Sequence, residues 1–251
     1  MSATERAIML VKAAPHPSRR YQETVCCAGV TAAGEWRRLY PVRYRHLDGA
    51  ARFSRWDILE YSWRMPKDDR RRESRRVEEP TLKRVGKMPE TERAAFFAPL
   101  VRSSSQAAAD RGESLALVRP RSMQFRCRPK RASDVAAERD KIAEVRRQGS
   151  LFEAPLSELE PTPVHMAMVY EDASGRHTMM CGDWETNATF YKWRQEYGEA
   201  IAIEQLRATY EDRYMKAGVV LALGTVAKRP KQWLLLGILR LNEERQLGLA
   251  L

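Results

Sequence analysis

Short apolar and alternating segments dominate the first 65 residues and predict β-strands. The strand-like segments are residues 7–11, 23–30, 35–42 and 56–63. A glycine-containing loop at 31–34 separates the second segment from the third, which favours a hairpin. We therefore expect a small, curved, mostly antiparallel sheet in this part of the chain.

The middle of the chain has a different pattern. Residues 67–76 contain no apolar side chain, so we expect an exposed loop or helical turn that buries no face. Beyond it, the pattern predicts a helix that begins near residue 89, strands at 114–118 and 123–127, and a bridging helix at 133–147. Residues 151–163 hold three prolines and three glutamates and indicate a linker.

The last 90 residues predict two strands, two helices and two strands in that order. The segments are 164–170, 177–184, 186–197, 200–216, 219–226 and 233–241. The final two strands are almost continuously apolar, which indicates that both of their faces are covered. We predict an α+β fold with a basic, mostly antiparallel β-rich N-terminal part and a C-terminal β-β-α-α-β-β part. The expected divisions are 1–132, 133–163 and 164–251, which could form one compact domain, and the sequence shows no internal repeat.

Positive charge is concentrated in the first three-fifths of the chain. Residues 1–150 hold 33 Lys and Arg against 19 Asp and Glu, whereas residues 151–251 hold 11 against 14. Of the 33 basic residues, 27 are arginine, whose planar fork suits phosphate and guanine. This asymmetry indicates a nucleic-acid-binding face, DNA or RNA, in the N-terminal part. The alternatives are a solvated arginine-rich surface, or a protein-interaction module whose acidic C-terminal part docks a protein partner.

Several function classes lack their motifs here. The sequence has no glycine-rich phosphate loop, no G-x-S-x-G and no kinase signature. Four cysteines without C-x-x-C spacing predict reduced thiols and no zinc finger. No apolar run reaches the roughly 20 residues that span a bilayer, and residues 1–6 do not resemble a secretory signal. We therefore expect a cytoplasmic protein with no membrane partner and no cofactor.

Three arginine-rich clusters are the candidate nucleic-acid contacts. They are Arg19, Arg20 and Tyr21; then Trp36, Arg37, Arg38, Tyr40, Arg43 and Arg45; then Arg70, Arg71, Arg72, Arg75 and Arg76. In the second cluster aromatic and arginine residues are interspersed, so bases could stack while guanidinium groups hold phosphates. The alternative is that Trp36 and Tyr40 are core aromatics and the arginines only face solvent. If the cluster binds, replacing Arg37 and Arg43 by alanine should lower affinity without lowering thermal stability.

An enzymatic alternative centres on His177, Asp183 and Glu185. On a continuous strand their even spacing would place them on one face, where two carboxylates and an imidazole could hold Mg²⁺ for phosphodiester cleavage. The common nuclease pattern has a lysine two residues after the glutamate, and here that residue is Asn187. Asp183 could equally begin the following helix, where acidic residues are favoured. We expect the chain to be an accessory or recognition subunit rather than an enzyme.

A longer pattern resembles a family of uncharacterised prokaryotic proteins. It runs S-x-x-Y-x-E-T-V-C-x-A-G-V from Ser18 and W-x-R-L-Y-P-V from Trp36, followed later by D-W-E at Asp183 and G-T at Gly224. This resemblance covers most of the chain. It implies a bacterial, cytoplasmic protein and no particular chemistry.

Overall fold

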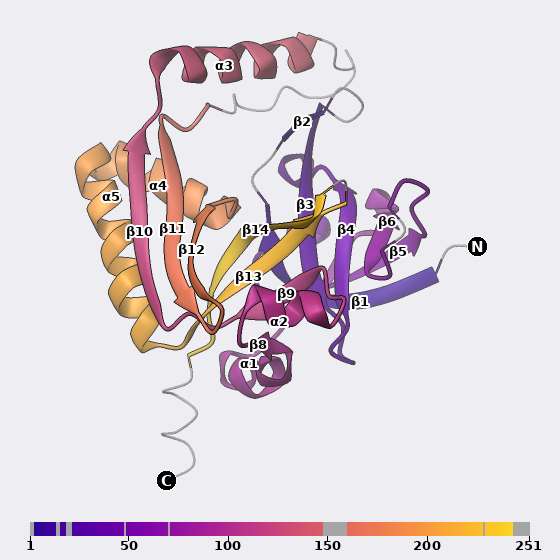
Figure 1. The fold of residues 1–251 in the computed structure, drawn as a ribbon. Coiled ribbons are helices and arrows are strands. Elements are labelled where there is room, and N and C mark those ends of the chain that lie inside the picture. Colours follow the sequence, from indigo (N-terminus) through magenta and orange to yellow (C-terminus); the bar gives the residue numbers. More distant parts are fainter. Residues whose placement is uncertain are drawn as a thin grey trace.

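The computed structural model describes residues 3–13, 16–18, 22–47, 49–69, 71–147, 160–227 and 229–242. The fold is α+β, as the sequence predicts, with strands in both halves and helices mainly in the second (Figure 1). The predicted C-terminal order β-β-α-α-β-β is confirmed. Its elements are β11 (Val164–Asp172), β12 (Gly175–Met180), α4 (Trp184–Tyr197), α5 (Glu199–Ala208), β13 (Val219–Val226) and β14 (Arg229–Arg240).

Five N-terminal strands close into a barrel. They are β1 (Ala3–Lys12), β3 (Gln22–Val30), β4 (Trp36–Val42), β5 (Asp57–Arg64) and β6 (Ser74–Val77). The order is β1-β3-β4-β6-β5, and β5 pairs again with β1. The β4–β6 pair is parallel and the others are antiparallel. This closed five-stranded order is that of an OB-type barrel, here named the first barrel. Two short strands extend it: β2 (His16–Ser18) pairs with β3, and β7 (Lys83–Lys87) pairs with β5.

The remaining strands repeat this order. β9 (Leu115–Val118) leads into β10 (Ser122–Pro129), which pairs with β11, and β11 pairs with β12. A parallel bridge between Cys181 and Leu235 joins the end of β12 to β14. β14 pairs with β13, and β13 returns to β9. The strands belong to two sheets, β10-β11-β12 and β14-β13-β9-β8. When β9 and β10 are taken as one bent strand, the neighbours follow the order of the first barrel, and we call this region the second barrel. α4 and α5 lie between its third and fourth strands.

The two barrels share a wall. Val219, Leu221 and Leu223 of β13 face the core of the second barrel, beneath α4 and α5. Val220 and Ala222, which alternate with them, pack on Leu10 and Val30 of the first barrel and on Phe97 of α1 (Glu90–Phe97). The interior of the first barrel is a separate cluster that includes Leu39, Phe53, Leu59 and Tyr61. Both faces of β13 are therefore covered, as its continuous apolar sequence predicts.

Three further elements lie between the barrels or contact both of them. β8 (Val101–Arg102) and α2 (Ser105–Asp110) precede β9, and the sequence pattern predicts neither of them. α3 (Ala132–Arg147) follows β10 and contacts β2 of the first barrel, at the top of Figure 1. Of the predicted linker 151–163, residues 151–159 lie outside the described residues.

Two local expectations are wrong. Residues 67–76 are not exposed throughout, because Ser74 and Arg75 lie in β6 and are only 3% and 7% exposed. Arg75 can be buried here because its guanidinium group pairs with Glu5 and stacks on Trp63. The strand expected at 177–184 ends at Met180, and Asp183 caps the helix that follows.

All four cysteines are free thiols. Within the described ranges, none of the helices has both the length and the apolar character needed to cross a membrane.

Candidate nucleic-acid interface

One row of side chains crosses the outer face of the first barrel. Leu39 is fully buried inside the barrel, so its neighbour Tyr40 points outward. Tyr40 is opposite Arg76 of β6, and Arg76 is opposite Arg64 of β5. Tyr40 is 43% exposed, Arg64 is exposed and Arg76 is half-buried. An accessible aromatic ring therefore lies in register with two arginines, and we call this set the Tyr40 row.

Other arginines of the predicted face point into the barrel. Arg37 is 7% exposed and forms ion pairs with Glu5 and Glu35, each with an N–O distance of 2.6 Å. Arg75 is equally buried, reaches Glu5 at 3.3 Å and stacks on Trp63, with its guanidinium carbon 3.8 Å from the ring centroid. Burial alone would lower the pKa of Arg37, but its two carboxylate partners raise it. Because both guanidinium groups are buried and paired, neither arginine is placed to bind a phosphate at the surface.

Arg38 and Arg71 face the second barrel. Nη2 of Arg38 donates to the carbonyl and hydroxyl oxygens of Ser114 at 3.1 and 3.2 Å, while its buried Nε has no hydrogen-bond partner. Burial, together with the charge of Arg71, lowers the pKa of Arg38. Arg71 pairs with Asp69 at 2.6 Å and donates through Nη1 to the carbonyl of Thr225 at 2.8 Å. Both arginines therefore connect the barrels.

The rest of the predicted set is mixed. Arg43 is paired with Glu79 at 2.9 Å, and the largely exposed Arg72 reaches Glu35 at 3.2 Å. Arg45 and Trp36 are half-buried, and Trp36 packs against the apolar cluster between the barrels. Four predicted residues lie outside the described residues: Arg19, Arg20, Tyr21 and Arg70.

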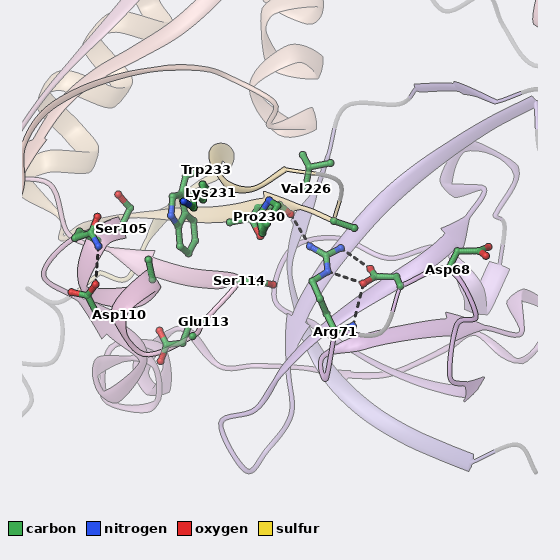
Figure 2. Close-up of a pocket in the computed structure, with 16 residues that line it drawn as sticks. Asp68, Arg71, Ser105, Asp110, Glu113, Ser114, Val226, Pro230, Lys231 and Trp233 are labelled. Atoms are coloured by element: carbon green, nitrogen blue, oxygen red, sulfur yellow. Dashed lines mark hydrogen bonds and ion pairs between the residues drawn. The ribbon is translucent and has the colours of Figure 1, made fainter.

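A cavity of about 920 Å³ opens between the barrels. The loop between β5 and β6, α2 and the β13–β14 hairpin line it, and Figure 2 shows Arg71 reaching from the loop toward the hairpin. Its charged lining residues are Asp68, Asp69, Asp110 and Glu113 against Arg71 and Lys231. Because carboxylates outnumber cationic groups, this cavity does not suit a phosphate.

The structure does not bring His177, Asp183 and Glu185 together. His177 binds Asp172 at 2.9 Å and stacks on Tyr170. Burial would raise the pKa of Asp172, but hydrogen bonds from Ser174 and His177 lower it.

The two acids of the proposed metal site have other partners. Glu185 lies in α4, not on the strand, and pairs with Lys12 at 2.7 Å. Asp183 is 1% exposed and accepts hydrogen bonds from Arg55, Thr186 and two backbone amides. The described part of the chain holds no group of three His, Cys, Asp or Glu residues arranged to bind a metal ion. The arrangement therefore lends the nuclease alternative no support.

Arg64 is the member of the Tyr40 row that is not among the residues predicted from the sequence. It is the last residue of β5, and nothing local distinguishes it from other surface arginines. Only the register between β5 and β6 places it beside Arg76.

Two protein-family models match the chain. Residues 3–99 match a model described as Domain of unknown function (DUF8758), and residues 100–250 match one described as Domain of unknown function (DUF8757). No curated protein matches. The division between the two models falls between α1 and β9, so each match contains one of the two barrels.

Proposed function

The chain belongs to the family described as Domain of unknown function (DUF8757), and we propose from its geometry that it binds single-stranded nucleic acid. The carrying observation is the Tyr40 row on a closed OB-type barrel. OB barrels bind oligonucleotides on the face of their second and third strands, beside the loop between strands four and five. In the first barrel these elements are β3, β4 and the connection between β5 and β6. Tyr40 lies on the third strand, and Arg76 and Arg64 continue the row onto the fifth and fourth strands.

The chemistry of the row fits an unpaired strand. A base can reach a tyrosine ring on a sheet only when it is not stacked in a duplex, and such stacking contributes about 1–3 kcal/mol per base. Arg64 and Arg76 lie beside the ring, where guanidinium groups can hold the flanking phosphates. The excess positive charge of residues 1–150 adds long-range attraction. The arrangement supports both DNA and RNA as ligands.

Fluorescence anisotropy with labelled oligo-dT and oligo-U tests this proposal. Wild-type affinity should fall steeply between about 50 and 200 mM salt. Tyr40→Ala should weaken binding about 10-fold, whereas Tyr40→Phe, which keeps the ring, should bind like wild type. Arg64→Ala with Arg76→Ala should also reduce the salt slope by about 1.4, because each phosphate contact of a single strand contributes about 0.7.

Lys83→Ala with Lys87→Ala is the matched control, since it removes two exposed positive charges from β7 of the same barrel. If this control weakens binding as much as the arginine pair, the interaction is only general charge attraction and the Tyr40 row is not the site. Absence of binding to any oligonucleotide at low salt would reject the function. A stoichiometric protein partner would then favour the protein-interaction alternative.

A further inference from the structure

The second barrel also presents an exposed sheet face. Along β10, Met123 and Phe125 are buried in the barrel core, while Gln124, Arg126 and Arg128 alternate with them and are exposed. A strand alternates its side chains between two faces, so these three polar residues share the outer face. They belong to the basic first 150 residues, but none of them is among the nucleic-acid contacts predicted from the sequence.

Register extends this face across β11 and β12. Arg126 is opposite Ala167, which is opposite Met180, and Arg128 is opposite His165. His165 is exposed, and Met180 is 55% exposed. This end of the sheet therefore combines two arginines, which can contact phosphates, with an imidazole ring and an apolar side chain, which can contact bases.

The other end of the same face is electrostatically different. There Arg176 is opposite Glu171, and a hollow of about 340 Å³ is lined by both residues together with Glu211 and Asp212. The acidic residues offset the charge of Arg176. The positive end of the face is consequently the one that carries Arg126 and Arg128.

The positive end lies toward the first barrel's candidate site. β10 ends at Pro129, one residue after Arg128, and continues into α3. α3 contacts β2, which pairs with the Gln22 end of β3. Tyr40 lies near that same end, because β3 and β4 are paired from Val25 opposite Val42. Figure 1 shows α3 above the ends of both sheets.

We propose that the β10–β11–β12 face, through Arg126 and Arg128, is a second contact surface for the same single-stranded nucleic acid. This inference rests on the proposed function and extends the length of nucleic acid that the protein contacts. A strand longer than one OB barrel covers, about 4–16 nucleotides, contacts the Tyr40 row and the second face together. The second contact is then intramolecular, so affinity rises with length beyond one footprint.

The test compares strands of about 8 and 24 nucleotides. Wild type should bind the longer strand at least about 10-fold more tightly. Arg126→Ala with Arg128→Ala should remove most of that gain and reduce the salt slope for the longer strand by about 1.4. The same variant should bind the shorter strand within about 2-fold of wild type, because the Tyr40 row is intact.

Arg207→Ala with Arg213→Ala is the matched control, since it removes two exposed arginines from the helical side of the second barrel. An unchanged affinity and salt slope for the longer strand in the Arg126 and Arg128 variant would overturn the inference. Tyr40→Ala separates this failure from failure of the proposed function. If only Tyr40→Ala weakens binding, the first barrel alone is the site; if only the Arg126 and Arg128 variant does, the second face stands and the Tyr40 row is rejected.

Discussion

Arg55 and Asp183, 128 positions apart in the chain, form a buried ion pair in which Nη2 lies 3.0 Å from Oδ1 and 3.1 Å from Oδ2. Nε and Nη1 of Arg55 donate to the carbonyls of Leu10 and Ile238 at 3.1 and 2.7 Å. Asp183 in turn accepts from the amide of Ile238 at 3.2 Å. The side chain of Arg55 therefore links β1 of the first barrel to β14 and to the start of α4 through hydrogen bonds.

Asp183→Asn should reduce stability by about 3–5 kcal/mol, because it leaves the buried charge of Arg55 without its counterion. Urea unfolding followed by circular dichroism measures this change. Asp212→Asn, at an exposed position on the adjacent π-helix, should change stability little. Equal stability of the two variants would show that the ion pair does not hold the barrels together.

Arg37→Ala should be far more destabilising than Arg43→Ala. Arg37 is buried with two carboxylates, and its loss should cost about 3 kcal/mol. The Arg43 side chain is one-third exposed, and its pair with Glu79 should contribute less than about 1 kcal/mol. This reverses the sequence-based expectation that both could be replaced without loss of thermal stability. Differential scanning calorimetry of the two variants measures this difference. Similar midpoint temperatures would contradict the prediction that Arg37 contributes more to stability than Arg43.

Asp69 should make the stability of the fold depend on pH in the acidic range. Burial alone would raise the pKa of Asp69, but hydrogen bonds from Arg71 and Ser74 outweigh burial and lower it to about 2. Since an unfolded aspartate titrates near pH 3.9, the charged form stabilises the fold above about pH 4. That stabilisation is lost as pH falls from about 4 to about 2.

The measurement is the thermal midpoint of wild type and Asp69→Asn across this range. Wild type should be the more stable at about pH 5, and the difference should shrink toward about pH 2. Asp68→Asn, at the exposed neighbouring position, is the control and should show no such convergence. A difference that stays constant with pH would mean that the Asp69 hydrogen bonds do not stabilise the fold.

Gly29→Ala should disrupt the pairing of β1 with β3. A Cβ at Gly29 would lie 2.6 Å from the carbonyl oxygen of Ile8, and backbone cannot move aside as a side chain can. We expect a loss of about 1–3 kcal/mol or more in urea unfolding. Gly86→Ala is the matched control, because its Cβ would meet only Ile58 at an ordinary 3.5 Å. Comparable losses in both variants would show that the close contact with the carbonyl oxygen of Ile8 is not the cause, since Gly→Ala by itself lowers the entropy of the unfolded chain and favours folding.

Local patterning predicted most of the fold. The strands of the first barrel, the hairpin at Gly34 and the C-terminal strand and helix order all follow from apolar periodicity and turn residues. Periodicity carries no information about which distant strands pair. The sequence therefore could not show that β9 and β10 belong with β11 to β14, or that two barrels repeat one order without repeated sequence.

Fewer residues of the candidate site could be predicted from the sequence, for a related reason. Arginines at successive strand positions alternate between faces, so Arg37 enters the barrel while Arg38 faces the second barrel. Whether such a residue meets a carboxylate, a carbonyl or solvent depends on residues such as Glu5 and Ser114, which are distant in the chain. Composition indicated a basic surface, but only register selected Tyr40, Arg64 and Arg76 from it.

The wall formed by β13 has a consequence for how the protein can be divided. Because alternate residues of this strand complete two different cores, removing either family-matched region would expose an apolar face of the other. The two regions should therefore melt in a single cooperative transition, and neither should be recovered as an independent proteolytic fragment. A gene break near residue 99 would yield halves that regain solubility only when produced together.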